Sequence, residues 1–321
     1  MAREYPMGLA TREAYGQTLV KLGHEDPNVV VLDADLSKST QTHMFGKEFP
    51  ERFFNAGICE ANMVSMASGL ALCGKTPFVS SFSVFLIDKS FDQLRMCVAY
   101  PGTNVKVVVS HGGISVGEDG PSQQAIEDIA LACSLPGFIV NVPADEVATR
   151  ALVRRAYERR GPVFMRVGRP KAPIIYAASE QFELGKGKRV EVGDDLTIIT
   201  CGGLLIESLR ARDQIEKEFG LRASVVDMHT IKPLDGDLIV AEAQRTGAVL
   251  VVEEALADGA LSSAVARCLA ERLPTLAAFV TLPDTYAESG TPAQLYDKYG
   301  LSARGIAAAA RKLLDRKATA K

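Results

Sequence analysis

The sequence predicts an α/β protein with two domains, each built on a mainly parallel sheet flanked by helices. Short apolar runs rich in valine, isoleucine and phenylalanine recur along the chain, and segments of helical character separate them. This composition is typical of buried parallel strands, because helices cover both faces of such a sheet. The length of 321 residues also suits two domains better than one compact core.

The first domain takes its strands from the apolar runs of the N-terminal half. These strands are predicted at residues 28–35, 76–82, 105–112, 137–145 and 162–168. Helices are predicted at residues 11–22, 60–73, 84–99, 123–133 and 145–158. Several of the helical segments end at glycine or at Pro-Gly, as helices commonly do at their C-terminal ends. The first domain is therefore a repeated strand–helix unit.

The second domain repeats this pattern on a smaller scale. Its strands are predicted at residues 195–203, 222–228, 248–255 and 278–284, and its last helix near residues 302–316. The connection between the two series contains Pro170, Pro173 and a polar stretch before the strand periodicity resumes. We therefore predict one domain at residues 1–180 and a second at residues 190–321.

Composition excludes several classes of function. Lysine and arginine total 36 against 39 aspartates and glutamates, a net charge of -3, so no overall basic field attracts nucleic acid or an anionic membrane. No apolar stretch approaches the roughly 20 residues that span a bilayer, and the N-terminus lacks a secretory pattern. The six cysteines stand singly, without zinc or disulfide spacing. We expect a cytoplasmic protein with reduced thiols and no metal ligands of its own.

Polar residues follow several of the predicted strands. Because parallel sheets bind ligands at the carboxyl ends of their strands, these positions are the first candidates for a site. In the first domain they are Asp35, Ser37, Ser39, the stretch 80–85, the loop from His111 to Asp119, and Arg169. In the second domain they are Gly202, Gly203, His229, Glu253 and Glu254. The second set contains no obvious pairing of a nucleophile with a base, so the first domain is the better candidate for catalysis.

Glu60 starts a predicted helix whose next positions are almost entirely small or apolar. Two interpretations stay open from the residues alone. An acidic residue in the first turn commonly complements the helix macrodipole, and the spacing slightly favours this structural role. Alternatively, the apolar surroundings make Glu60 a desolvated carboxylate that is available for proton exchange.

Two further segments are candidates for ligand binding. Phe82 and Phe85 lie three residues apart at a strand-to-helix transition, where aromatic residues usually belong to a core. They would serve function only if a flat heteroaromatic ligand stacks on them. The loop 111–124, HGGISVGEDGPSQQ, places a histidine, several glycines and two acids after a strand. A simple connection does not need these residues, so we interpret this loop as functional.

Ordered motifs along the chain resemble the two C-terminal domains of transketolases. The strings ATRE, DADLSKST, GICEANM, SSFSVF, SHGGISVGEDGPSQ and MRVGRP resemble the pyrimidine-binding domain. The later strings CGG, HTIKPLD, VVEEALADGALSSAV and ESGTPAQLYDKYGL resemble the transketolase C-terminal domain. The resemblance covers practically the whole chain and implies a pyrimidine-binding domain at residues 1–180 and a transketolase C-terminal domain at residues 190–321.

One motif of transketolases is missing from this sequence. These enzymes hold the diphosphate of thiamine diphosphate and its metal ion with a Gly-Asp-Gly motif in an N-terminal domain, and no GDG occurs here. The chain therefore resembles the C-terminal subunit of a split transketolase. The resemblance implies thiamine diphosphate with Mg²⁺ (or Ca²⁺) bound mainly by a separate N-terminal subunit. It also implies a two-fold dimer of each chain within an α2β2 heterotetramer.

The resemblance assigns cofactor-binding roles to individual residues. Glu60 matches the catalytic glutamate that hydrogen-bonds the aminopyrimidine ring nitrogen of the cofactor and promotes proton removal from thiazolium C2. Phe82 and Phe85 match the aromatic residues that stack on the pyrimidine, and the position of a third aromatic is Asp88 here. Asp35 matches an acidic residue near the cofactor.

The resemblance also assigns a substrate-binding set. The residues that match the ring around the sugar phosphate are Arg12, Ser39, His111 and Arg169. Asp119 matches the acid that contacts the C2 hydroxyl of the substrate. Gln123 stands where many microbial members carry histidine, and it can donate a hydrogen bond to the donor sugar but cannot exchange protons near neutrality.

The resemblance implies ketol transfer between sugar phosphates, as in the pentose phosphate pathway. Alternatives are a β-subunit of a 2-oxoacid dehydrogenase, a 1-deoxyxylulose-5-phosphate synthase-like enzyme, and a non-catalytic regulatory subunit. The GEDGP loop with its expected phosphate ligands disfavours the dehydrogenase. The presence of Glu60, Phe82, Phe85 and Asp119 disfavours the regulatory subunit. Phosphosugar, apiose-derived and sulfosugar transketolases could all share this sequence pattern.

Overall fold

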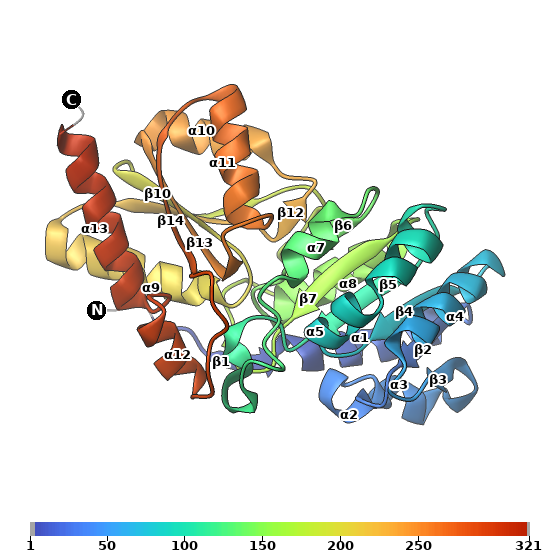
Figure 1. Ribbon diagram of the computed structural model, residues 1–321. Coiled ribbons are helices and arrows are strands. Elements are labelled where there is room, and N and C mark those ends of the chain that lie inside the picture. The colour runs from blue at the N-terminus through green and yellow to red at the C-terminus, as the bar shows by residue number, and fades with distance from the viewer. Residues whose placement is uncertain (1–3, 320–321) are drawn as a thin grey trace.

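A computed structural model describes residues 4–319 and has two α/β domains, which Figure 1 shows side by side. The first domain, blue to green, contains a seven-stranded sheet with the order β12-β6-β7-β5-β4-β2-β3. The second, yellow to red, contains a five-stranded sheet with the order β14-β13-β10-β11-β9. Helices pack on both sheets, so the predicted fold class is confirmed.

The first sheet is parallel apart from one edge strand. Its strands are β2 (Val29–Asp33), β3 (Phe53–Asn55), β4 (Thr76–Ser80), β5 (Lys106–Ser110), β6 (Ile139–Asn141), β7 (Val163–Val167) and β12 (Thr230–Lys232). Strand β12 pairs antiparallel with β6, although it lies in the C-terminal half of the chain. A strand from the second series of elements therefore completes the sheet of the first domain.

Helices cover both faces of this sheet. They are α1 (Thr11–Glu25), α2 (Ser37–Thr40), α3 (His43–Glu48), η1 (Pro50–Arg52), α4 (Glu60–Leu72), α5 (Ser83–Lys89), α6 (Phe91–Gln93), η2 (Leu94–Ala99), η3 (Ile114–Asp119), α7 (Asp128–Ser134) and α8 (Glu146–Glu158). Along β2, Val29 and Val31 pack in one buried cluster while Val30 and Leu32 pack in another. This alternation follows from the two-residue period of a strand and explains why the run is apolar throughout.

The second sheet is parallel except at β9. Its strands are β9 (Lys188–Glu191), β10 (Leu196–Thr200), β11 (Ala223–Asp227), β13 (Ala248–Leu256) and β14 (Leu276–Leu282). Its helices are α9 (Leu204–Phe219), α10 (Gly236–Thr246), α11 (Leu261–Arg272), α12 (Pro292–Lys298) and α13 (Ala303–Thr319).

A separate antiparallel pair joins β1 (Met7–Ala10) to β8 (Lys171–Pro173). None of the helices within residues 4–319 is long and apolar enough to cross a membrane.

Two helix predictions need correction. The single helix predicted at 84–99 is interrupted at Ser90, whose hydroxyl donates to the carbonyl of Leu86 and competes with the helical hydrogen bonds. The helix predicted at 123–133 begins only at Asp128, because Ala125 bridges to Gly112 and its carbonyl accepts from the amide of Gly113 at 2.6 Å. Residues 123–127 therefore belong to the loop and not to the helix.

Candidate active site

The predicted site residues of the first domain lie near the carboxyl ends of neighbouring strands. Asp35 follows β2, Phe82 follows β4, His111 follows β5 and Arg169 follows β7, and these four strands are consecutive in the sheet. The pairing of β4 with β5 continues one step beyond the end of β4, because the amide of Ser110 donates to the Ser81 carbonyl at 3.1 Å. This pairing places Phe82 beside His111. The sheet topology thus gathers side chains that are distant in sequence.

Glu60 is the first residue of α4 and is only 2% exposed. The Ser81 hydroxyl lies 3.5 Å from its Oε1, and the Lys89 Nζ lies 3.4 Å from its Oε2. The carboxylate therefore lies at the N-terminus of a helix with the Lys89 amine beside it. Both of the predicted interpretations are compatible with this placement, since Glu60 begins a helix and is also withdrawn from solvent.

Phe82, Phe85 and His111 form a group of nearly parallel rings. The Phe82 and Phe85 centroids are 5.6 Å apart with an interplanar angle of 16°, and Phe82 and His111 are 3.8 Å apart at 22°. Lys89 lies over Phe85, with its Nζ 4.5 Å from the ring centroid. The same lysine therefore links the aromatic group to Glu60.

His111 is buried and neutral. Burial, followed by the positive charges of Arg12 and Arg169, lowers its pKa to about 3. The Ser110 hydroxyl lies 2.8 Å from Nδ1, and the backbone of His111 is left-handed with φ 60°. Such a backbone is uncommon for a non-glycine residue and is concentrated at functional sites. A neutral imidazole here can donate or accept a hydrogen bond but carries no charge for a substrate.

We expect His111 to make the protein less stable in acid. Between its folded pKa of about 3 and its ordinary value of 6.5, the unfolded chain binds a proton that the folded chain does not. Stability therefore falls as the pH drops through this window, by up to about 1.4 kcal/mol per pH unit from this group. Urea unfolding at several pH values should show a shallower dependence for His111→Gln than for the parent. His43→Gln, at an exposed histidine, is the control variant.

Arg12 and Arg169 place two guanidinium groups near each other. The amide of Gly168 donates to the Thr11 hydroxyl at 2.6 Å. This hydrogen bond brings Arg12, which follows Thr11, close to Arg169, which follows Gly168. Burial, followed by the charge of Arg169, lowers the pKa of Arg12. Arg12 Nη1 donates to the Ser39 carbonyl at 2.8 Å, while its buried Nε has no partner. Two neighbouring guanidinium groups with an unused N–H donor have the chemistry that an anionic group needs.

Arg169 also contacts the loop 111–124. Its Nη1 donates to the Val116 carbonyl at 2.6 Å and to Glu118 Oε2 at 3.1 Å, and its Nη2 lies 4.0 Å from Asp119 Oδ1. Asp119 is exposed, and Gln123 is partly exposed with its Oε1 accepting from Ser122 at 2.6 Å. The two acidic residues in the middle of the loop therefore lie beside Arg169.

Asp35 is not joined to the other predicted residues by a direct contact. Its backbone amide donates to Asn55 Oδ1 at 3.1 Å, and Asn55 Nδ2 donates back to Asp35 Oδ1 at 3.2 Å. Like His111, it has a left-handed backbone, with φ 65°. Asn55 ends β3, the neighbour of β2, so this pair lies at the same edge of the sheet.

Sequence reasoning missed several residues that shape the site. Lys89 contacts Glu60, and buried Asp33 accepts hydrogen bonds from Thr40 and Thr42 that shape the turn carrying Asp35. Arg166 lies in the middle of buried β7. A charged residue inside a predicted buried strand was a usable signal, because such a charge needs a buried partner.

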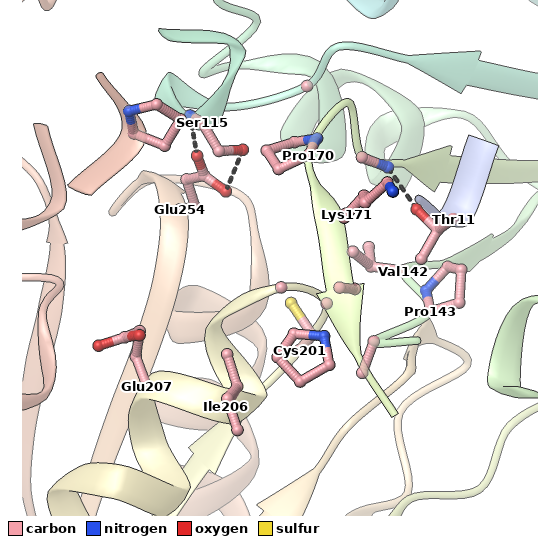
Figure 2. A pocket seen from close by; sticks show the side chains of 18 of the residues that line it. Thr11, Ser115, Val142, Pro143, Pro170, Lys171, Cys201, Ile206, Glu207 and Glu254 are labelled. Atoms are coloured by element: carbon pink, nitrogen blue, oxygen red, sulfur yellow. Dashed lines mark hydrogen bonds between the residues drawn. The ribbon is translucent and has the colours of Figure 1, made fainter. Parts of the chain in front are cut away.

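A cavity of about 280 Å³ lies between the two domains. Gly202, Gly203 and Glu254, which follow predicted strands of the second domain, line it, whereas the residues matched to cofactor and substrate binding do not. Figure 2 shows Ser115, Thr11 and Lys171 on one side of it, and Cys201 and Ile206 of the second domain on the other.

Among residues 4–319, no group of three or more histidine, cysteine, aspartate or glutamate side chains could hold a metal ion.

Two family models match the chain over nearly its whole length. Residues 7–174 match the pyrimidine-binding domain of transketolase, and residues 185–306 match the transketolase C-terminal domain. The chain belongs to the transketolase family. The predicted family is confirmed, and the two sheets correspond to these two domains of the family. The exact domain boundaries at 1–180 and 190–321 stay a prediction.

Relatives of the family fall into two length classes. A chain from Methanocaldococcus jannaschii named as a transketolase C-terminal section is 46% identical, covering 92% of this chain and 93% of that one. A 6-deoxy-6-sulfo-D-fructose transketolase subunit from Clostridium is 36% identical over 95% of both chains. Human transketolase is 40% identical, but the chain spans only 49% of its length.

A solved structure agrees with the first class. It is described as an inactive β4 tetramer of a split-gene transketolase, with a TM-score of 0.89 and 47% identity. It covers 96% of this chain and 99% of its own. The chain therefore has the extent of a transketolase C-terminal section, as its missing GDG motif predicts.

Proposed function

We propose that this chain is the pyrimidine-binding and C-terminal subunit of a thiamine-diphosphate-dependent transketolase. With a separate diphosphate-binding subunit, it transfers a two-carbon ketol unit from a ketose phosphate to an aldose phosphate. The observation that carries this proposal is the placement of buried Glu60 beside Lys89 and the Phe82–Phe85 pair, with Arg12 and Arg169 gathered around neighbouring strand ends.

The surroundings of Glu60 fit the aminopyrimidine of thiamine diphosphate. Its contacts with Ser81 and Lys89 are long for hydrogen bonds, which leaves the carboxylate able to bind a ring nitrogen. Partly buried Phe85 offers a ring for stacking. When bound, the cofactor supplies the nucleophilic carbon that carries the ketol unit. Glu60 would share a proton with the pyrimidine nitrogen, and Asp35 would lie near the cofactor.

The arginine pair and the loop suit the sugar phosphate. Arg12 and Arg169 supply charge-assisted donors for its phosphate, with Ser39 and neutral His111 completing the ring of polar groups. Asp119 accepts from the C2 hydroxyl. Gln123 donates a hydrogen bond to the donor sugar without exchanging a proton. This division assigns substrate binding to this chain and leaves the diphosphate and its metal ion to the partner subunit.

The surface around Glu60 suits burial by partner subunits. Ile58 precedes α4 and is 77% exposed, Leu72 ends it and is 75% exposed, and Tyr100 follows the adjacent η2 and is 84% exposed. Helix α4 and η2 pack against each other, so these large apolar side chains belong to one region of the first domain. Apolar surface of this kind marks a protein interface. We propose an α2β2 heterotetramer in the cytoplasm, with this surface covered.

The purified chain should be inactive and should bind thiamine diphosphate weakly, because it supplies only the pyrimidine half of the cofactor site. Adding the diphosphate-binding subunit should restore both ketol transfer and tight cofactor binding. Titration calorimetry with cofactor and Mg²⁺, and a coupled ketol-transfer assay, measure the two properties separately. Ketol transfer by the single chain, free of any partner, would contradict the proposed division of labour.

A sulfosugar is a second candidate donor. The Clostridium relative carries a sulfo-fructose in its name, and the Arg12–Arg169 pair would also bind a sulfonate. A sulfonate has a smaller negative charge than a phosphate monoester, so two guanidinium groups attract it less strongly. We expect the complex to prefer fructose 6-phosphate over 6-deoxy-6-sulfofructose in kcat/KM. The opposite preference would assign the chain to sulfosugar metabolism while leaving the reaction type unchanged.

A further inference from the structure

A buried ionic cluster joins the two domains. Arg166 of β7 lies between two carboxylates, with Nη1 3.1 Å from Asp128 Oδ1 and Nη2 3.6 Å from Glu254 Oε2. Its Nη2 also donates to the Glu254 backbone carbonyl at 3.0 Å. All three side chains are at most 9% exposed. Asp128 and Arg166 come from the first domain and Glu254 from β13 of the second, so the cluster crosses the domain boundary.

Glu254 binds the start of the functional loop. The backbone amide of Ser115 donates to its Oε1, and the Ser115 hydroxyl donates to its Oε2 at 3.2 Å, as Figure 2 shows. The Tyr296 hydroxyl of α12 donates to the same Oε2 at 3.1 Å. The carboxylate therefore satisfies donors from the loop, from Arg166 and from α12 at once.

The loop backbone packs directly on this ion pair. A Cβ atom added at Gly112 would lie 2.2 Å from Arg166 Nε, and one at Gly113 would lie 2.4 Å from Glu254 Cδ. Any side chain at these positions would displace the pair. The ionic cluster approaches the two residues after His111 so closely that only glycine fits there. This explains the two consecutive glycines of the HGG motif.

The second domain supports the rest of the loop as well. Helix α12 packs against η3. Gln124 Nε2 donates to the Glu288 carbonyl at 3.1 Å, and a Cβ at Gly117 would lie 3.2 Å from Pro292. The loop is thereby held at its beginning by Glu254 and along its length by the segment 288–296.

We propose that Glu254 is a positioning residue that lets the second domain fix the loop 111–124, and with it His111, Asp119 and Gln123, for binding the sugar. This assignment rests on the proposed function, because it presumes that the loop binds substrate. Removing the negative charge leaves Arg166 and the Ser115 donors incompletely paired, so the loop loses its fixed conformation. Glu60 makes none of these contacts, since its carboxylate faces Ser81 and Lys89.

Glu253 provides a matched control one residue away. It is also buried on β13, but its carboxylate accepts from the amides of Leu261 and Ser262 at 2.8 and 2.7 Å within the second domain. Its contacts stabilise the start of α11 and do not reach the loop. Glu253→Gln should therefore lower the melting temperature without changing substrate binding.

The experiment compares Glu254→Gln, Tyr296→Phe and Glu253→Gln in the complex with the diphosphate-binding subunit. For Glu254→Gln we expect KM for the ketose phosphate to rise about tenfold, with deuterium exchange at C2 of the bound cofactor within about twofold of the parent. Amide hydrogen exchange across 111–124 should become faster. Tyr296→Phe removes one hydroxyl and keeps the ring. It should also raise KM and speed amide exchange across 111–124, but by smaller factors.

The outcomes separate this role from general stability. The proposal is wrong if Glu254→Gln keeps the parental KM and the parental amide exchange of the loop. It is also wrong if Glu253→Gln raises KM and speeds loop exchange as much as Glu254→Gln does. If the parent complex transfers no ketol unit, the proposed function fails. Loop exchange still decides whether Glu254 fixes the loop, because that measurement requires no activity.

Discussion

Replacing Glu60 with glutamine should reduce ketol transfer by at least about 10²–10⁴-fold, the range typical of a group that exchanges a proton in the rate-limiting chemistry. The amide keeps the shape of the side chain but cannot share a proton with the pyrimidine nitrogen. The most direct measurement is hydrogen–deuterium exchange at C2 of thiamine diphosphate in the assembled complex. It should slow in the variant by a similar factor, while the complex still forms.

The control for this variant is Glu271→Gln, which removes an exposed carboxylate on α11 and should behave as the parent. Glu60 also begins α4, so its substitution could weaken the helix through the macrodipole by roughly 0.3–1 kcal/mol. That effect would lower the melting temperature without slowing C2 exchange. Parental exchange combined with a lower melting temperature would therefore assign Glu60 the structural role that its spacing alone favours.

Most strands of the two sheets could be predicted because they lie in largely apolar runs, but the short edge strands β3 and β9 could not. The short strand β12 could not, since Thr230–Lys232 gains its partner only when β6 of the other domain lies beside it. Likewise, the break at Ser90 depends on a hydroxyl that competes for the Leu86 carbonyl. The helical periodicity of apolar residues does not reveal such a hydrogen bond. Local apolar patterns thus determined the main elements, and long-range pairing determined the edge strand β12. A local side-chain hydrogen bond accompanies the break in the predicted helix.

The site was predictable in part for a similar reason. A parallel sheet aligns its carboxyl ends, so residues following β2, β4, β5 and β7 were expected together, and the structure places them there. The ionic cluster of Arg166 was not predicted. Its partners lie 38 and 88 positions away in sequence, and only the packing of the two domains brings Glu254 to the loop. The catalytic and binding roles of the predicted residues stay predictions.

Arg12→Ala should raise KM for phosphorylated sugars by about 10–150-fold, the equivalent of losing a charge-assisted hydrogen bond of about 1.5–3 kcal/mol. Arg169→Ala should have a similar effect on phosphate binding. Arg12 is the cleaner test, because Arg169 also holds the Val116 carbonyl and Glu118 of the loop. The measurement is kcat/KM for two donors that differ only in the terminal phosphate.

Donors without the phosphate should bind the Arg12 variant and the parent alike, because they never contact the guanidinium. A structural arginine would instead impair both donors through disturbed folding. Arg154→Ala serves as the control, since Arg154 pairs with Glu25 at the surface, where such pairs contribute little to stability. Equal losses for the two donors would remove Arg12 from the phosphate site. The unpartnered Nε of Arg12 makes that result unexpected, because a buried donor without an acceptor is costly unless a ligand completes it.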